Sequence, residues 1–480
     1  MSVEFVARRV PNLSFKYRAE KISANHYVMP RTGRMKADAQ AFFSASLFEA
    51  SEESLWQQLV AAASYEGVIG AYLMPDAHTG FGVPVGCVIV TEDTIIQAGS
   101  GYDISCGVLH LRVPGLSADK VADPDKRALW VASVESRIAT GIGSHRPRCM
   151  PSFSQSRGDD ILRYGAKALG VSASVCERQY IQLPDDVDLC SIERAYDKVL
   201  SQLGSVGGGN HFIEMQVDRD TGEVWVMVHC GSRGYGWQTA NHFFYEGAEL
   251  RGLPKNRRED SWLYVDEPLG RAYWAHHNSA ANYAIANRHI IVQGVMDALN
   301  EVFDCKAEVY YEISHNLVQQ ETLVLPDGTT KRGYVHRKGA TRAFPAGHPD
   351  LVGSVWARTG HPCLIPGSMY EGAAILFAEP GVAQSGYSVN HGSGRLLARG
   401  AAKRSLRASQ YRIDSEMREV ERDFAGVKIR GIVGNTEHPP LDECAHVYKN
   451  LDEVLRVLEA QGIAKVAHRL YPVANLKGTD

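Results

Sequence analysis

The spacing of apolar and polar residues along the chain predicts both helices and strands. Apolar residues on one side of the segment predict a helix over Glu53–Ser64. Arg271–Phe303, rich in alanine, tryptophan and tyrosine, is predicted to be a long helix with at most one break. A third helix is predicted over Asp452–Gln461, with Asn450 as its N-cap and Gly462 at its end.

Strand-like runs are more numerous than helices. Gly107–Val113 alternates, which predicts a strand with Leu109, Leu111 and Val113 on one face and Val108, His110 and Arg112 on the other. Val224–Val228 and Ala307–Ile313 are β-branched or aromatic runs, and a histidine follows each of them closely. We therefore predict a mixed α/β (α+β) fold with central β-sheets, as one large domain over residues 1–480.

Composition narrows the class of protein. The 480 residues are 44% hydrophobic and 22% charged, which is typical of globular chains and argues against disorder. The formal net charge of -4 provides no overall basic field, so a nucleic-acid substrate would need a local basic surface. The nine cysteines form no CxxC pair, which argues against a disulfide framework or a zinc ribbon and favours a reducing compartment.

The N-terminus and the apolar stretches predict where the protein resides. The first residues, MSVEFVARRV, contain an early acidic residue and no long apolar region, unlike a signal peptide. The longest apolar stretches, such as Pro84–Val90, are far shorter than the roughly 20 residues of a membrane helix. We expect no membrane span and a cytoplasmic protein.

Five short segments share one arrangement, in which a strand-like run meets a glycine- or asparagine-rich turn that carries a metal-capable side chain. Rigid strand ends with open turns are common positions for functional groups. The segments are GYDISCG (101–107), GGGNH (207–211), VHCGSRG (228–234), ISHN (313–316) and NHGSGR (390–395).

A carboxylate, a thiol and three imidazoles of these segments are candidate metal ligands. Asp103 and Cys106 are three residues apart, close enough to face one cation, and a thiolate can bridge two metal ions. With His211, His229 and His315 they could hold one or two divalent transition ions. The alternative is that each is structural, since a lone histidine often is and a lone cysteine is commonly a small buried apolar residue.

His391 differs from the other histidines because glycines surround it. If Gly394–Arg407 is helical, its N-terminus offers backbone N–H groups to a phosphate, and a neutral imidazole there could attack phosphorus. Arg395, Arg399, Lys403, Arg404 and Arg407 add positive charge to this segment. The alternative is a solvated basic helix. The basic stretch Val335–Arg342 also suits phosphate contacts, and its alternative is a polar hairpin.

These segments, with several others, resemble the RtcB family of GTP-dependent RNA ligases. The resemblance runs from about residue 70 to the end and covers residues 1–70 less well. The matching stretches are MPDAHTGFGVPVG (74–86), GYDISCGV (101–108), LGSVGGGNHFIEMQ (203–216), VHCGSRGYG (228–236), SHNLVQQE (314–321), VHRKGATRAFPAG (335–347), LIPGSM (364–369), HGSGR (391–395) and ANLKG (474–478).

The resemblance implies a single-domain ligase that joins RNA 2′,3′-cyclic phosphate or 3′-phosphate ends to 5′-hydroxyl ends, using GTP and two Mn²⁺ ions, in RNA repair or tRNA splicing. It implies one ion on Asp103, Cys106 and His211, a second on Cys106, His229 and His315, and His391 as the nucleophile that accepts GMP. The implied nucleotide site comprises Asn210, His211, Glu214, His315, Asn316, Pro366, Gly367, Ser368, Met369, His391, Gly392, Ser393, Gly394 and Lys477.

The chain departs from the family pattern after LIPGSM. It reads Tyr370–Ala374 where the family more often has a serine-containing run, and Glu371 would repel phosphate if it faced the site. The chain also continues to Thr479 and Asp480 beyond the usual final glycine. These differences indicate a divergent paralogue, whose preferred ends could be nicked or damaged RNA, or DNA 3′-phosphate.

Two other functions remain open at this point. One is a metal-dependent cyclic phosphodiesterase or phosphatase that does not ligate, and the other is a non-catalytic RNA-end binding protein. Every candidate metal-ligand position holds a side chain that can bind a metal ion, which argues against the non-catalytic binding protein. The family resemblance also makes archease a candidate activating partner, and we expect a monomer.

Overall fold

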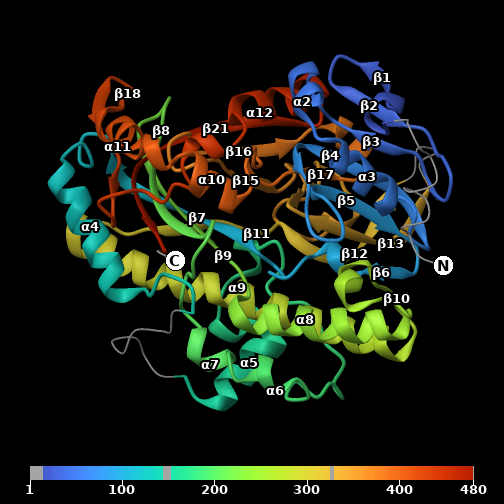
Figure 1. Cartoon of the computed structure of the whole chain (residues 1–480). Helices are drawn as coiled ribbons and strands as arrows, with labels where there is room; N and C mark the ends of the chain where they lie inside the picture. Colours follow the sequence, from blue (N-terminus) through green and yellow to red (C-terminus); the bar gives the residue numbers. More distant parts are fainter. Residues whose placement is uncertain (1–13, 144–152, 325–328, 479–480) are drawn as a thin grey trace.

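Two large β-sheets and one long helix form the frame of the protein (Figure 1). The computed structural model describes residues 14–143, 153–324 and 329–478. The first sheet has seven strands, ordered β1 (Glu20–Ser23), β2 (His26–Met29), β3 (Ala39–Ala41), β4 (Val68–His78), β5 (Val85–Thr91), β13 (Thr330–Lys338) and β12 (Asn316–Val324). Its strands pair antiparallel except for the parallel pair of β3 and β4.

The second sheet has eight strands and contains the runs that the residue pattern predicts. Their order is β11 (Glu308–Ser314), β7 (Gly107–Ser117), β9 (Glu223–Cys230), β8 (Phe212–Asp218), β21 (Ala464–Lys477), β16 (Ala373–Ala378) and β15 (Pro362–Pro366), with β20 (Val433–Gly434) beside β21. The smaller pairs are β6 (Thr94–Ile96) with β10 (Trp262–Tyr264), β14 (Ala340–Arg342) with β17 (Ser388–Asn390), and β18 (Glu421–Phe424) with β19 (Val427–Arg430).

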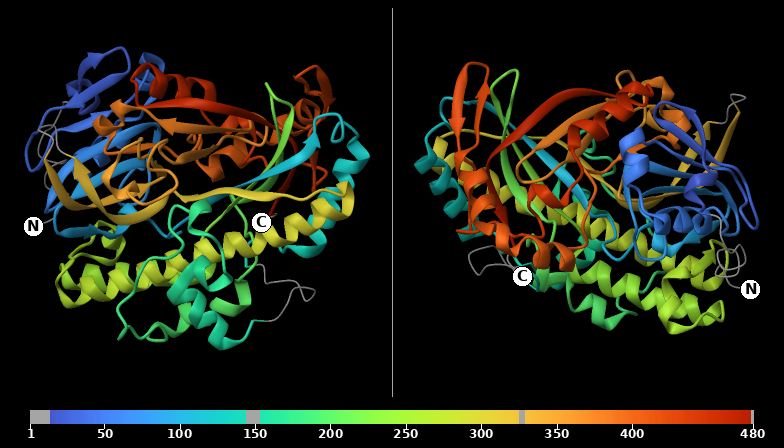
Figure 2. Two further views of the ribbon diagram at one scale, coloured as in Figure 1. Left: turned by 180° about the vertical axis from the view of Figure 1, so that it is seen from behind. Right: turned by 45° about the horizontal axis from the view of Figure 1, so that its top comes forward.

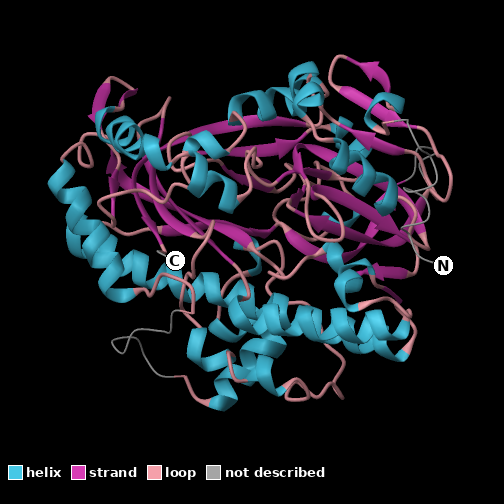
Figure 3. Cartoon of the chain, viewed as in Figure 1, coloured by secondary structure: helices cyan, strands magenta, loops and turns pink. Residues whose placement is uncertain are grey.

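Helices cover both sides of these sheets (Figure 3). On the lower side in Figure 1 lie α5 (Gln155–Tyr164), α6 (Glu193–Tyr196), α7 (Val199–Gln202), α8 (Arg233–Leu250) and α9 (Pro268–Phe303), and α4 (Pro124–Arg137) lies at the left. Elsewhere lie α2 (Ala45–Ala50), α3 (Glu53–Ala62), α10 (Arg399–Ser405), α11 (Gln410–Glu419) and α12 (Leu451–Ala460). The prediction of a mixed α/β fold with central sheets is confirmed.

The long helix α9 runs unbroken for 36 residues beneath both sheets, as both views in Figure 2 show. It starts at Pro268, where the fixed φ of proline and its missing N–H suit the first helical turn. Its middle is buried almost all round, because the second sheet lies on one side and α5 and α8 on the other. The predicted helix over Arg271–Phe303 is therefore confirmed without a break.

The second sheet is buried on both faces. The alternating pattern of β7 accounts for the apolar residues on one face, but not for the burial of the other face, which also carries polar residues. Leu109, Leu111 and Val113 pack in one core with α4 and α9, as predicted for one face. Val108 packs in a separate core on the opposite face, beside Trp225. His110 is also buried there, and burial lowers its pKa to about 4 while Gln216 bonds its ring. A neutral histidine therefore tolerates this interior position.

The predicted helix over Gly394–Arg407 is wrong in its N-terminal part. The helix α10 begins only at Arg399, so His391 does not precede a helix N-terminus. Gly394 has a φ of 76°, and a Cβ atom at this position would overlap the Asp76 carbonyl. The chain therefore passes close against β4 at Gly394 and cannot be helical there. In contrast, α12 has the predicted N-cap, since Asn450 Oδ1 accepts from Glu453 N at 2.9 Å.

Arg288, in the middle of α9, holds three turns of the second sheet together. Its Nη1 donates to Ser105 O (2.6 Å) and Cys230 O (2.9 Å), and its Nη2 donates to Ser314 Oγ (3.1 Å). Its Nε donates to Glu312 Oε1 (2.7 Å), and both side chains of this ion pair are buried. Burial raises the pKa of Glu312 to about 7, although the charge of Arg288 acts in the opposite direction.

We expect Arg288→Met to lower the free energy of unfolding by about 3–5 kcal/mol, because Glu312 would stay buried without its partner. Urea denaturation followed by circular dichroism measures this change. The matched control is Arg271→Met on the exposed part of the same helix, which we expect to change stability by no more than about 0.5 kcal/mol. Equal stability of the two variants would contradict the role of Arg288.

Candidate active site

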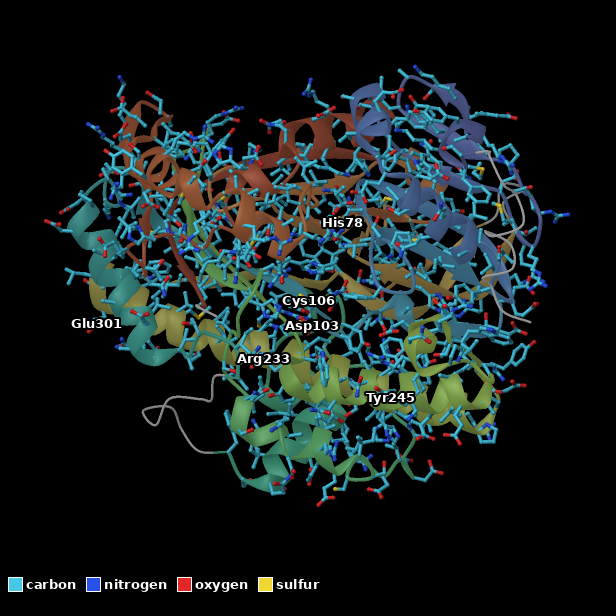
Figure 4. The ribbon with its side chains drawn as sticks, in the orientation of Figure 1. His78, Asp103, Cys106, Arg233, Tyr245 and Glu301 are labelled. Atoms are coloured by element: carbon cyan, nitrogen blue, oxygen red, sulfur yellow. The ribbon has the colours of Figure 1, made fainter. Side chains whose placement is uncertain are left out.

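A cavity of about 300 Å³ lies where strands of the two sheets meet. From the first sheet, β4, β5 and β13 contribute His78, Val85 and Lys338. From the second, β8, β9, β15 and β21 contribute Phe212, Glu214, His229, Pro366 and Lys477. Figure 4 shows His78, Asp103 and Cys106 near the centre of the molecule. The cavity therefore collects side chains from segments far apart in the sequence.

The five candidate metal ligands converge at this cavity. Cys106 Sγ lies 3.4 Å from His211 Nε2 and 3.2 Å from His229 Nε2. Asp103 Oδ2 lies 2.9 Å from His211 Nε2, and His315 Nε2 lies 3.2 Å from His229 Nε2. Cys106, His211 and His229 have ligand atoms within 4.8 Å of one another. A carboxylate, a thiol and three imidazoles thus form one continuous chain of donor atoms.

A tight turn brings Asp103 and Cys106 together. Cys106 N donates to Asp103 O (3.1 Å), and Ser105 between them has a φ of 58°. Ser105 N also donates to Asn316 O (2.6 Å), which ties this turn to the turn that carries His315. The guanidinium group of Arg288 hydrogen-bonds Ser105, Cys230 and Ser314. These three residues are the direct chain neighbours of Cys106, His229 and His315. The positions of three candidate ligands therefore depend on one buried arginine.

The protonation pattern of these side chains fits a cation. His211 Nδ1 donates to Val206 O (2.9 Å), so in a neutral ring the Nε2 lone pair faces the Asp103 carboxylate. Two lone pairs at 2.9 Å repel each other unless a proton or a metal ion lies between them. Burial lowers the pKa of His229 and of His315 well below the usual value, which keeps both imidazoles neutral and able to bind metal. Burial also raises the pKa of Cys106, and a bound cation would replace its proton.

His391 lies beside this cluster and is held by a buried aspartate. Its Nδ1 donates to Asp76 Oδ2 (2.6 Å), and the backbone N–H groups of His391 (3.1 Å) and Gly392 (3.3 Å) donate to the same oxygen. The His391 side chain is 17% exposed, and its ring centroid lies 5.1 Å from that of His315. With Nδ1 occupied, the Nε2 lone pair of the neutral ring is the one available for reaction.

The residues that the resemblance assigns to the nucleotide line the same cavity, except His211, which lines an adjoining hollow. Asn316 Oδ1 accepts from Gly339 N (2.8 Å) and its Nδ2 donates to Asp103 O (3.4 Å). The cavity residues of this set are Asn210, Glu214, His315, Asn316, Pro366, Gly367, Ser368, Met369, His391, Gly392, Ser393, Gly394 and Lys477.

Glu214 and Lys477 are close enough for their charges to interact, but each has another side chain as its direct partner. Burial raises the pKa of Glu214 to about 7, while Gln216 bonds its Oε1 (2.7 Å) and Lys477 adds a weaker opposing effect. Lys477 Nζ instead contacts Glu443 Oε2 (3.3 Å) and lies 5.3 Å from the centroid of the Phe212 ring. The cavity therefore presents a carboxyl group and an ammonium group beside an aromatic face.

Several of the basic residues form ion pairs with buried carboxyl groups. Arg395 (3.2 Å) and Arg399 (3.3 Å) both pair with the buried Glu443. In the stretch Val335–Arg342, Arg337 pairs with Glu321 and Arg342 with Glu177, and all four side chains are buried. Arg337 and Arg342 therefore do not make the phosphate contacts that this stretch was expected to suit. Within the stretch, Lys338 lines the cavity, and its Nζ donates to Val83 O (3.0 Å).

The departures after LIPGSM leave the cavity open. Glu371 Oε1 accepts from Asn450 Nδ2 (3.1 Å), and this residue is not part of the cavity lining in the described chain. Burial raises the pKa of Glu371, which favours its neutral form. The concern that Glu371 repels phosphate is thereby removed. Thr479 and Asp480 lie outside the described residues.

Sequence reasoning assigned no role to Asp76, Tyr448 or Glu443. Asp76 lies inside the matching stretch MPDAHTGFGVPVG, so the motif itself was the available signal. Glu443 binds Arg395, Arg399 and Lys477 in the cavity wall, and Tyr448 OH donates to it. Nothing in the residue pattern around Glu443 indicates this role, because its partners come from distant segments.

Comparison with known proteins gives the family. The model of the family described as tRNA-splicing ligase RtcB matches residues 58–478. The chain belongs to the RtcB family. A relative from Thermococcus kodakarensis, named tRNA-splicing ligase RtcB, is 34% identical over 93% of this chain and 95% of its own length. A relative from Mycobacterium tuberculosis, named RNA-splicing ligase RtcB, is 31% identical over 88% of this chain and 100% of its own length.

The match to the RtcB family confirms the resemblance found in the sequence. The family model begins at residue 58, in keeping with the weaker resemblance of the first 70 residues. A relative from Archaeoglobus fulgidus, also named tRNA-splicing ligase RtcB, is 31% identical over 96% of this chain and 98% of its own length.

Among the helices of the described residues, none is both long and apolar enough to cross a bilayer.

We expect Cys106→Ala to lower the divalent metal content of the protein to near zero, because its sulfur lies 3.4 Å from His211 Nε2 and 3.2 Å from His229 Nε2 and so contacts both halves of the donor cluster. Elemental analysis after Mn²⁺ loading and gel filtration measures this stoichiometry. The matched control is Cys363→Ala, a buried cysteine outside the cavity lining, which should bind metal like the parent protein. Unchanged metal content in Cys106→Ala would refute the assignment.

Proposed function

We propose that this protein is an RNA ligase that joins 2′,3′-cyclic phosphate or 3′-phosphate ends to 5′-hydroxyl ends, as in RNA repair or tRNA splicing. GTP and Mn²⁺ are the proposed cofactors. Membership of the RtcB family and the printed names of its relatives support RNA ligation. The observation that carries the mechanism is His391, whose Nδ1 is held by Asp76 while its ring borders the cavity next to the donor cluster.

In the first proposed step, His391 Nε2 attacks the α-phosphorus of GTP. A phosphorus–nitrogen bond forms, the bond to the bridging oxygen breaks, and pyrophosphate leaves with the electron pair. Asp76 supports this step because its carboxylate stabilises the positive charge that develops on the ring. It also fixes the tautomer, so that the nucleophilic nitrogen faces the cavity.

In the second and third proposed steps, the nucleotide activates the RNA end. After any cyclic phosphate has been opened by water, an oxygen of the 3′-phosphate attacks the phosphorus on His391 and takes over GMP. The RNA 5′-hydroxyl then attacks the activated 3′-phosphate, loses its proton, and GMP departs. A 3′,5′-phosphodiester results, and His391 returns to its free form. Charge neutralisation and alignment dominate such phosphoryl transfers.

Two divalent ions would suit this chemistry. We assign Asp103, Cys106 and His211 to one ion and Cys106, His229 and His315 to the other, with Cys106 shared. When bound, the ions supply charge neutralisation for the phosphates. Thiolate and imidazole donors normally favour zinc, so the assignment of Mn²⁺ rests on the family, and we expect zinc to bind as well.

Guanine selectivity is consistent with the residues at the far wall of the cavity. Guanine presents N–H donors at N1 and N2, which suit the Glu214 carboxylate, and an acceptor at O6, which suits Lys477. Adenine reverses this pattern and would offer neither group a matching partner on the base, so ATP should be rejected. The carboxylate form of Glu214 is accessible near neutral pH, since its pKa is raised by burial to about 7.

The need for archease, the monomeric state, the single domain over 1–480 and the cytoplasmic location stay predictions.

A cyclic phosphodiesterase or phosphatase would use the same metal ligands but would leave His391 idle. The Asp76–His391 contact favours the ligase over that alternative, because a carboxylate that holds Nδ1 leaves Nε2 of a ring bordering the cavity free to act as a nucleophile. A non-catalytic RNA-binding protein would need neither feature. A covalent nucleotide on the protein separates the ligase from both alternatives.

We expect incubation with [α-³²P]GTP and Mn²⁺ to label the protein through an acid-labile, alkali-stable bond. His391→Ala should abolish labelling, whereas the matched control His446→Ala, at a half-exposed histidine outside the cavity, should be labelled normally. Gel electrophoresis and autoradiography measure the label. Persistent labelling of His391→Ala would reject the nucleophile.

Asp76→Asn should slow labelling by about 10²- to 10⁴-fold, because an amide can turn its N–H towards the ring and favours the wrong tautomer. Single-turnover labelling kinetics measure this rate. Manganese content should stay unchanged, since Asp76 contacts His391 and not the donor cluster. A labelling rate equal to that of the parent protein would show that Asp76 serves only packing.

A further inference from the structure

Trp237 on α8 borders a second hollow that adjoins the active-site cavity. This hollow has a volume of about 340 Å³ and shares Asp103, Asn210 and Arg399 with the cavity. The glycine turn 208–209 forms another part of its wall. Arg233, one turn before Trp237 on α8, lines this hollow together with Asp103, and both are labelled in Figure 4. An extended ligand could therefore occupy the hollow and reach the candidate metal ligands.

The indole ring of Trp237 is supported by an aromatic neighbour and also lines the hollow. The ring of Tyr102 stacks on it with a centroid distance of 5.8 Å and an interplanar angle of 22°. Tyr102 itself packs against Phe244 at 4.9 Å, and Arg258 Nη2 donates to its hydroxyl (3.1 Å). Trp237 is nevertheless 47% exposed. A large aromatic side chain held in place yet half exposed is suited to stacking with a planar ligand.

The charges in the hollow indicate the chemistry of that ligand. Arg233 and Arg399 both line it, and each is oriented by a neighbour, Arg233 through Ser205 Oγ (3.1 Å) and Arg399 through Glu443 (3.3 Å). Asp103 is the one carboxylate among the described lining residues, and it contacts His211. Guanidinium groups beside an aromatic ring suit a phosphate attached to a planar base.

We propose that Trp237 stacks on the base of the nucleotide adjacent to one of the RNA ends being joined. This inference rests on the proposed ligase function and adds a substrate contact to it. Sequence-tolerant stacking on aromatic rings is a common means of binding unpaired nucleotides. A protein partner fits less well, because glycines and polar or charged residues make up most of the described lining and Ile142 is the one large apolar side chain besides Trp237, whereas protein interfaces need a broader apolar centre.

Steady-state ligation with abasic substrates tests the stacking contact. One substrate lacks the base next to the 3′-phosphate, a second lacks the base next to the 5′-hydroxyl, and the reference RNA has both bases. Trp237→Ala should raise KM for the reference RNA by about 5- to 150-fold, the usual range for one base stacked on an aromatic ring. The parent protein should lose a similar factor with one abasic substrate, and Trp237→Ala should lose no more with it. The substrate that shows this pattern identifies the end that stacks.

Matched variants separate this inference from the proposed ligase function. Trp237→Phe should restore most of the affinity, and Tyr245→Ala, an exposed aromatic on the same helix outside both cavities, should behave like the parent protein. GTP labelling should be equal in all these proteins. Failure of the parent protein to label would reject the ligase function.

The stacking contact is overturned if labelling is normal and Trp237→Ala discriminates between intact and abasic RNA as the parent protein does. It is also overturned if the variant handles RNA normally but no longer responds to archease, which would assign Trp237 to protein docking.

Discussion

One buried guanidinium group organises the candidate active site. Arg288 projects from α9 and binds backbone or side-chain oxygens of Ser105, Cys230 and Ser314, each directly adjacent in the chain to a candidate metal ligand. Its guanidinium group is paired with the buried carboxyl group of Glu312. Because α9 is rigid and buried along its middle, the three turns have a fixed common anchor. The donor atoms are therefore brought together by hydrogen bonds of Arg288, a residue that neither reacts nor binds metal in the proposed mechanism.

The reactive histidine depends on a second constraint, which comes from the other sheet. Asp76 belongs to β4 of the first sheet and binds His391, whereas His229 extends from β9 of the second sheet. The distance between the nucleophile and the donor cluster is therefore set by how the two sheets pack. Glu443 adds a third tie by gathering Arg395, Arg399 and Lys477 on the cavity wall. These ion pairs show how a chain with a net charge of -4 can keep a local set of cations for a polyanion.

The sequence predicted those features that depend on local pattern. The long helix, the strands β7, β9 and β11, and the capped helix α12 all follow from residue spacing. The turn segments that converge could also be recognised, because glycine and asparagine mark strand ends. Errors arose where distant residues decide the outcome. Gly394 packs against Asp76 and stops a helix that local preference favours, and Arg337 finds Glu321 on a neighbouring strand. Asp76 lies in a recognisable motif, but its pairing with His391, 315 positions further along the chain, depends on the fold.

The central claim is that Asp103, Cys106, His211, His229 and His315 form one metal site within reach of His391. Anomalous diffraction at the manganese absorption edge, from crystals grown with Mn²⁺, tests it most directly. The account predicts two anomalous peaks on either side of Cys106 Sγ, one beside Asp103 and His211 and the other beside His229 and His315. Manganese peaks located elsewhere, with these five side chains free of metal, would contradict it.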